Sequence, residues 1–133
     1  FAIVIYTLEH IYNYQNFINN INKSLVKGGR IEGVNPFLHQ YHKDPDDYFR
    51  YTHTALRRIL ENANFEDIKI TPICHGAFSV IVSMTSNFFK FRPLLLLLWT
   101  LAILLDYILN KFWKSNLNFY SALAFTAKKR NNI

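Results

Sequence analysis

The feature that most constrains the fold is the apolar run from Phe1 to Thr7, which includes the β-branched residues Ile3, Val4 and Ile5. A strand with one exposed face would alternate apolar and polar residues, whereas this run is continuous. Continuous runs are typical of strands buried on both faces, which occur almost only in parallel sheets covered by helices. The start of the sequence therefore predicts an α/β fold.

The segments that follow alternate between helical and strand patterns. The sequence predicts helices from Asn13 to Gly28-Gly29 and from Thr52 or Thr54 to Asn64, and strands at 30–34, 65–73 and 118–127. Strand, helix, strand, helix, strand is the signature of parallel βαβ units with right-handed crossovers. Three parallel strands and a terminal one would make half of such a sheet. Since residue 1 is not Met, we expect the chain to be the C-terminal part of a longer protein.

Composition excludes several classes of protein. The chain has 133 residues, 50% of them hydrophobic and 18% charged, which suits one domain with a core and not a disordered chain. Its single cysteine, Cys74, excludes an intramolecular disulfide framework and a zinc module built on several cysteines. Cys74 ends an apolar strand and is expected to be a packed thiol.

The net charge of +6 comes from basic residues that flank apolar segments. Nucleic-acid-binding proteins usually spread basic residues along one face with exposed aromatics between them. The layout here is closer to that of a membrane-surface segment, so we expect no nucleic-acid partner and keep a basic nucleic-acid binder as a weaker alternative. The basic residues in question are Lys90, Arg92, Lys111, Lys114 and Lys128-Lys129-Arg130.

Residues 76–113 predict a hydrophobic helical hairpin inserted before the last strand. Leu94 to Leu109 is interrupted only by Thr100 and Asp106, and as a helix it would be roughly 24 Å long. That is shorter than a hydrocarbon core of about 30 Å, so a membrane-spanning helix is not expected. Two interpretations stay open: a buried hairpin that covers the sheet or a dimer interface, and an interfacial anchor with its tryptophans at the headgroups.

Two segments follow predicted strands directly and would lie at the carboxyl edge of the sheet, where open α/β folds bind ligands. The first is Thr7-Leu8-Glu9-His10-Ile11. The second is the long loop from Phe37 to about Tyr51, which concentrates histidines, aspartates, an arginine and aromatics. Long loops in compact domains are usually functional, and this composition suits a pocket that grips a ring and handles a proton.

The same segments resemble class I S-adenosylmethionine-dependent methyltransferases. Leu8-Glu9-His10, a helix ending in Leu25-Val26-Lys27-Gly28-Gly29, and a strand into Asn35-Pro36-Phe37 are similar to that family's fourth strand, following helix and fifth strand. The stretch from His42 to Thr52 resembles a methyltransferase type 11 subgroup found in sugar- and polysaccharide-modifying gene sets. Residues 122–128 resemble the final antiparallel strand.

The resemblance implies the C-terminal half of a Rossmann-like methyltransferase sheet, with S-adenosyl-L-methionine as cofactor and methyl transfer to a glycan, a lipid-linked sugar or a related small molecule. It places the cofactor near the segment after the first strand, makes His10 the general-base candidate and makes the loop the acceptor site. The family's Gly-rich turn and ribose-binding acid are lacking, so these residues alone are expected to bind the cofactor very weakly. The implied residues are Thr7, Leu8 and Glu9 for the cofactor, and His42, Asp47, Tyr48, Arg50 and Tyr51 for the acceptor.

Each of these residues also has a purely structural interpretation. Glu9 is expected to cap or orient backbone amides of the following segment, and Arg50 could be the ion-pair partner of aspartates in a turn. A metal site in the loop is not expected, because the spacing of the available ligands matches no defined zinc pattern. Those ligands are His39, His42, Asp44, Asp46 and Asp47.

The main alternative to an enzyme is a non-catalytic fragment that binds a membrane or a partner through residues 76–113. The sequence predicts a cytoplasmic protein, with peripheral membrane contact if the hairpin is an interfacial anchor. It predicts neither whether the hairpin contacts lipid or protein nor the oligomeric state. The enzyme interpretation requires that the Glu9-His10 step and the Pro45-to-Arg50 stretch meet along one edge of the sheet.

Overall fold

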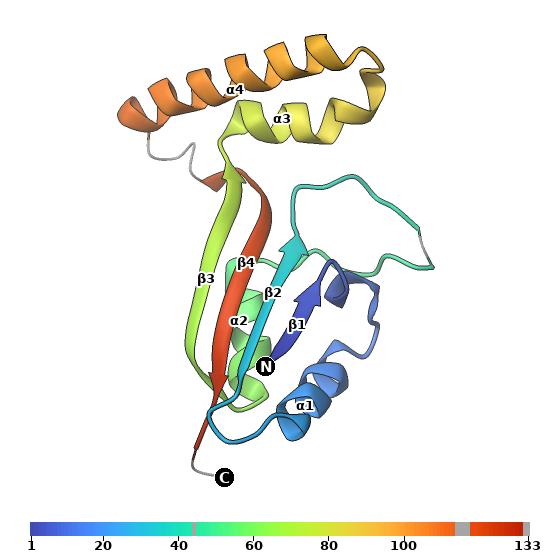
Figure 1. Ribbon diagram of the computed structural model, residues 1–133, viewed down its shortest axis with the longest axis vertical. Coiled ribbons are helices and arrows are strands. Elements are labelled where there is room, and N and C mark those ends of the chain that lie inside the picture. The colour runs from blue at the N-terminus through green and yellow to red at the C-terminus, as the bar shows by residue number, and fades with distance from the viewer. Residues whose placement is uncertain (44, 114–117, 132–133) are drawn as a thin grey trace. The chain divides into compact units, whose positions relative to one another are not determined.

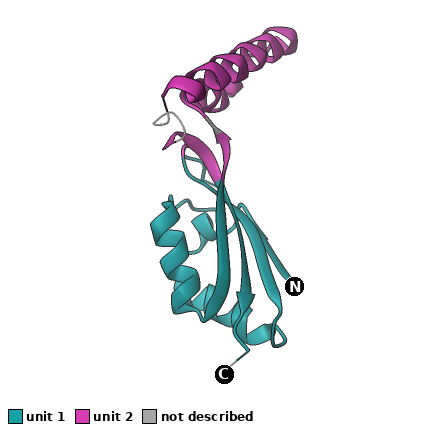
Figure 2. Cartoon of the chain, turned by 90° about the vertical axis from the view of Figure 1, so that its left-hand side faces the viewer, with its two compact units in different colours: residues 1–37, 41–71, 123–133 teal, residues 38–40, 72–122 magenta. Residues whose placement is uncertain are grey.

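A computed structural model describes residues 1–43, 45–113 and 118–131, and it contains all four predicted strands. The chain divides into two units, one of residues 1–37, 41–71 and 123–133 and one of residues 38–40 and 72–122 (Figure 2). Asp44 and Lys114, two residues considered above, lie outside the described residues.

The strands form one sheet in the order β1-β2-β4-β3. β1 and β2 are parallel, with Ala2 paired to Ile31 and Ile5 to Val34. Figure 1 shows β3 running in the same direction, whereas β4 runs against its neighbours. The predicted antiparallel final strand is thus present, and it lies between β2 and β3. The bounds are β1 Ala2–Ile5, β2 Arg30–Pro36, β3 Phe65–His75 and β4 Tyr120–Lys129.

Two helices of the first unit, α1 (Tyr14–Ser24) and α2 (His53–Asn62), begin at polar caps. The side chain of Asn13 accepts a hydrogen bond from the Asn16 amide at 3.3 Å, and that of Thr52 accepts one from Ala55 at 3.2 Å. The cap of α2 is therefore Thr52. The prediction that the first helix continues to Gly28 is wrong, because the backbone is extended at Leu25.

The expectation that the first strand is buried on both faces is also wrong. The helices of this unit lie on one side of the sheet (Figure 2), and Val4 and Ile31 are 3% and 0% exposed. On the other face Ile3 is 59% exposed and Ile5 is 54% exposed. The strand is apolar throughout, but the described residues of this unit place helices over only one of its faces.

The second unit contains the predicted helical hairpin, made of α3 (Ala77–Thr85), a short turn η2 (Ser86–Phe88) and α4 (Arg92–Phe112). α4 is longer than its apolar run because Arg92-Pro93 begins it and residues 110–112 extend it. Its 21 residues make a helix of about 32 Å, so the expectation that it is too short to span a hydrocarbon core is wrong. By length and composition it is one helix that could cross a membrane.

A buried carboxylate joins the two helices of the hairpin. Asp106 of α4 is 3% exposed, and its two oxygens accept hydrogen bonds from the backbone amides of Phe78 at 3.1 Å and Ser79 at 2.7 Å. These amides belong to the first turn of α3, where backbone N–H groups have no carbonyl partner within their own helix. Gly76 precedes that turn at φ +131, and a β-carbon there would lie 2.2 Å from Cγ of Asp106. The acid inside the apolar run is therefore a helix cap.

Candidate functional site

The candidate site is built where β1 and β2 end. A single 3₁₀ turn, η1 (Leu8–His10), follows β1 and packs against β2, and the long loop follows β2 (Figure 1). The amide of Tyr6 donates to the carbonyl of Val34 at 2.9 Å, so the ladder continues to the start of this turn. Both segments therefore begin at the carboxyl edge, as the sequence predicts.

Three contacts to backbone atoms hold η1 against the loop. Nδ1 of His10 hydrogen-bonds the carbonyl oxygen of Asp46. The amide of Tyr48 donates to the Glu9 carbonyl at 2.9 Å, and the hydroxyl of Tyr51 donates to the Leu8 carbonyl at 3.3 Å. Since all three partners are main-chain carbonyls, these contacts fix the path of the backbone independently of the side chains of Leu8, Glu9 and Asp46.

Side chains continue this connection into the loop. The imidazole rings of His10 and His42 meet edge to face, with their centroids 5.0 Å apart. The amide of His42 donates to Oδ2 of Asp47 at 3.1 Å, and Arg50 grips both oxygens of the same carboxylate. We refer to Glu9, His10, His42, Asp47 and Arg50 as the rim cluster. The required meeting of the Glu9-His10 step with the Pro45-to-Arg50 stretch is observed.

Arg50 controls the charge of Asp47. The hydrogen bonds from the guanidinium outweigh burial and lower the pKa of Asp47 to about 2, and the same bonds raise the pKa of Arg50. The Asp47 side chain is only 1% exposed. Because the guanidinium bonds both carboxylate oxygens, this bidentate ion pair stays ionised across the physiological pH range. It therefore holds this part of the loop in place. Its geometry agrees with the structural interpretation of Arg50, and a role of either residue in acceptor binding stays a prediction.

Glu9 is the unusual member of the rim cluster. It is 0% exposed, and neither carboxylate oxygen accepts a hydrogen bond from any described residue. The expectation that it caps backbone amides is wrong, because η1 closes through its own backbone, with the His10 amide donating to the Thr7 carbonyl at 3.0 Å. Nε2 of His10 lies 3.7 Å from Oε1 of Glu9. A buried carboxylate without hydrogen bonds is costly, so its presence calls for an explanation.

Aromatic rings form one wall beside the cluster. Tyr14 contacts both Phe49 and Tyr51, with ring centroids 5.2 and 5.6 Å apart, and Tyr12 contacts Tyr48 at 5.4 Å. Tyr51 is 4% exposed, and burial raises the pKa of its phenol. Tyr48 is 45% exposed and donates its hydroxyl to Asp46 at 3.2 Å. Of the two tyrosines predicted to bind the acceptor, only Tyr48 presents its ring to solvent.

The residues predicted to hold the cofactor offer little to a ligand. Thr7 donates its hydroxyl to the carbonyl of Ile5 at 2.8 Å, and Leu8, like Glu9, is 0% exposed. Sequence reasoning also overlooked Asn35 at the end of β2, which is 0% exposed with neither amide atom hydrogen-bonded among the described residues. Its position could have identified Asn35 as a candidate site residue, because it is a polar residue at the carboxyl end of a strand.

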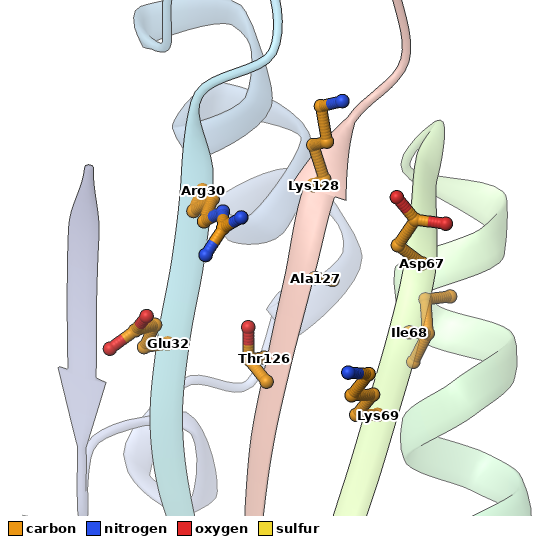
Figure 3. Close-up of a pocket in the computed structure, with 8 residues that line it drawn as sticks. All are labelled: Arg30, Glu32, Asp67, Ile68, Lys69, Thr126, Ala127 and Lys128. Carbon is orange, nitrogen blue, oxygen red and sulfur yellow. The ribbon is translucent and has the colours of Figure 1, made fainter.

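Two concavities lie on the sheet face that carries Ile3 and Ile5. The larger, of about 540 Å³, is lined by residues of β2, β3 and β4 with charges of both signs, among them Arg30, Glu32 and Lys69 (Figure 3). The other, of about 410 Å³, adds Ile3 and Ile5 of β1. None of their lining residues belongs to the rim cluster. These two concavities therefore do not coincide with the rim cluster. Titratable side chains that converge on one place are a better guide to chemistry than the volume of a concavity.

Comparison with solved structures identifies the fold. Phosphoethanolamine N-methyltransferase 2 of Haemonchus contortus, in complex with S-adenosyl-L-methionine, superposes with a TM-score of 0.57 at 13% identity over 97% of this chain and 33% of that one. A SAM-dependent methyltransferase from Archaeoglobus fulgidus gives 0.57 at 17% identity over 96% and 58%. The [4+2]-cyclase SpnF gives 0.54 at 13% identity over 97% and 49%.

No protein-family model and no curated protein matches the sequence. The structural matches confirm the prediction of a class I methyltransferase-like α/β fold. The chain spans from 33% to 58% of the length of these three structures. One of them is described as a cyclase, which illustrates that this fold supports more than one reaction.

Proposed function

We propose that this chain forms the acceptor side of an S-adenosylmethionine-dependent methyltransferase that modifies a glycan, a lipid-linked sugar or a related small molecule. The observation that carries the proposal is the rim cluster, which links His10 to Arg50 through His42 and Asp47 where two parallel strands end. The fold of the chain and the methyltransferases among its structural neighbours support it.

The described residues do not by themselves fit the cofactor. Two of the three side chains predicted to hold it, Leu8 and Glu9, are buried, and the hydroxyl of Thr7 is engaged with the backbone. A nucleoside needs exposed polar groups and an apolar surface for its base. We therefore expect the 133 residues alone to bind S-adenosylmethionine much more weakly than a complete methyltransferase does.

The contacts of His10 support the proposal that it is the general base. The Asp46 carbonyl accepts the hydrogen of Nδ1, which leaves Nε2 as the basic nitrogen of the neutral ring. The side chain is 17% exposed, so part of the ring faces solvent, and a general base must come within hydrogen-bond reach of the acceptor hydroxyl. Beside it, the exposed rings of Tyr12 and Tyr48 offer a surface on which a sugar ring could stack.

The test is methyl transfer by the full-length protein, followed by mass spectrometry with glycans and lipid-linked sugars as acceptors. His10→Gln should lower kcat by about 10²- to 10⁴-fold, the usual contribution of a general base. His53→Gln is the matched control, because His53 is an exposed imidazole at the start of α2. Transfer that is absent for every acceptor, or equal in the two variants, would overturn the proposed role of His10.

A second candidate function is binding to a membrane surface through the helical hairpin, which would make the protein peripheral on the cytoplasmic side. The most apolar 18-residue window of α4 has a mean hydropathy of 1.9, and only 11% of that window is buried. Its exposed side includes Leu97, Leu101, Leu104 and Ile108, which repeat at helical spacing. Basic residues at both ends of the helix would suit anionic headgroups, namely Lys90, Arg92 and Lys111.

Co-flotation with vesicles tests this second function. We expect the protein to float with vesicles rich in phosphatidylserine and to bind less as salt is raised. The double variant Leu101→Asp/Leu104→Asp should abolish flotation, whereas Thr100→Asn, on the same exposed helix, should not. Equal flotation of the two variants would contradict the proposal.

A further inference from the structure

We propose that Glu9, His10 and His42 form a binding site for a divalent transition-metal ion, best matched by Zn²⁺. One ligand atom from each residue lies within 4.8 Å of the other two. Ligands around tetrahedral Zn²⁺ at about 2.1 Å are roughly 3.4 Å apart, so closure needs side-chain shifts on the order of 1 Å. Oε1 of Glu9 and Nε2 of His10 are already close to that spacing at 3.7 Å.

The buried carboxylate is the independent observation that points to a ligand. Glu9 is 0% exposed, and among the described residues neither of its oxygens accepts a hydrogen bond. Nearby positive charge comes from Arg50, but that guanidinium is committed to both oxygens of Asp47. A cation at the carboxylate would supply the missing interaction, which the backbone around η1 does not.

His10 has the arrangement of a metal ligand. Histidines that bind metals usually donate their second ring N–H to a carbonyl or a carboxylate, and this bond sets the tautomer and the orientation of the ring. Nδ1 of His10 bonds the backbone carbonyl of Asp46 in this way. The lone pair is thereby left on Nε2, the atom that lies beside the Glu9 carboxylate. Nε2 cannot accept a proton while it binds the ion, so the general-base role proposed for His10 applies to the metal-free protein.

The third ligand is carried by a braced segment of the loop. His42 meets the ring of His10 edge to face, and its backbone amide donates to Asp47. Asp47 is in turn held by Arg50 on both oxygens. The Asp47–Arg50 pair thus holds the backbone of His42 and helps to keep its imidazole next to η1. His42 thereby meets Glu9 and His10, which lie more than 30 residues earlier in the sequence.

The donor set selects the kind of metal. Two imidazole nitrogens and one carboxylate oxygen suit Zn²⁺ and its first-row neighbours, whereas Mg²⁺ and Ca²⁺ prefer sites made wholly of oxygen. Three protein ligands leave a fourth position open for water or a hydroxyl, as in catalytic zinc sites. The set differs from the loop residues weighed from sequence, with which it shares only His42.

Binding of Zn²⁺ alone to the chelator-treated protein tests the site by calorimetry, and Co²⁺ absorption reports its geometry. We expect one ion per chain, little competition from Mg²⁺, and a loss of affinity of about 100-fold or more in Glu9→Gln and in His42→Gln. His53→Gln, which replaces an exposed imidazole at the start of α2, is the matched control and should leave the affinity unchanged within about twofold.

Circular dichroism shows whether each variant is folded. His42 lies in a loop with its side chain 35% exposed, so His42→Gln still tests the site if the buried Glu9→Gln does not fold. Failure of the wild type to bind Zn²⁺, or equal binding by wild type and folded His42→Gln, would overturn the site. Because the readout is metal binding, the result does not depend on whether the protein transfers methyl groups.

Discussion

The two units of the chain each bury a carboxylate, and the two carboxylates differ in what surrounds them. Asp106 in the helical hairpin is 3% exposed and accepts hydrogen bonds from two backbone amides of α3. Glu9 in the first unit is 0% exposed and accepts none from the described residues. Both are buried, yet of the two only Asp106 has, among the described residues, the hydrogen bonds that normally accompany burial.

The difference separates a structural acid from one for which we propose a function. Asp106 satisfies amides that the helix cannot satisfy itself, so its role is complete within the hairpin. Glu9 is buried without such hydrogen bonds, which is costly, and groups of this kind persist where a ligand or a reaction requires them. The four predictions below test this contrast, beginning with the largest expected effect.

Asp106→Ala should lower the free energy of unfolding by about 3 kcal/mol, because it leaves two buried amides without acceptors. Asp106→Asn retains one acceptor oxygen and should lose less. Urea unfolding measures the global change, and hydrogen exchange at the Phe78 and Ser79 amides should accelerate locally. Thr100→Ala, on an exposed position of the same helix, is the control. Unchanged exchange at both amides would show that the cap contributes nothing.

Glu9→Met should act in the opposite direction and raise the stability of the metal-free protein by about 1–2 kcal/mol, because it replaces a buried acid that accepts no hydrogen bond from the described residues by an apolar side chain of similar length. Thermal unfolding with and without Zn²⁺ makes the measurement. The ion should raise the Tm of the wild type and leave that of the variant unchanged. A variant less stable than the metal-free wild type would mean that Glu9 already has a stabilising partner.

The sequence predicts local structure better than it predicts which faces of the sheet are covered. The strands and helices follow from local patterns of apolar residues and from caps such as Asn13 and Thr52, so their predicted bounds agree with the structure to within a few residues. Exposure of Ile3 and Ile5 depends on whether helices cover that face of the sheet, which no local pattern encodes. The place of β4 between two earlier strands is non-local in the same way.

For the site, the sequence predicts which segments meet but not what the side chains do there. His10 and Arg50 can be assigned to one edge because both follow parallel strands. Side-chain packing across the loop decides that Glu9 accepts no hydrogen bond from the described residues and that Tyr51 is buried. The sequence alone does not show this packing. Capping is the natural expectation for an acid in a first turn, and it fails because the backbone of η1 closes on itself.

Tyr51→Phe should cost about 1 kcal/mol near neutral pH, because the hydroxyl that anchors η1 to the loop is lost. Burial raises the pKa of Tyr51 above the ordinary phenol value of 10.0, so the unfolded chain ionises first as the pH increases. Above about pH 10 the wild type should therefore lose roughly 1.4 kcal/mol per pH unit relative to the variant. Urea unfolding from pH 7 to 11 measures the gap, and a gap that does not narrow would contradict burial of the phenol.

The smallest effect is expected for a third carboxylate, which sets the scale for the other two. Glu61 lies near the end of α2 with a side chain 37% exposed, and it lies 3.8 Å from Arg58, whose side chain is 77% exposed. Water and salt screen such a pair, so Glu61→Gln should change stability by no more than about 0.5 kcal/mol. Urea unfolding at low and high salt checks this. A loss as large as that of Asp106→Ala would mean that burial is not what distinguishes these acids, and the inference drawn from Glu9 would fail with it.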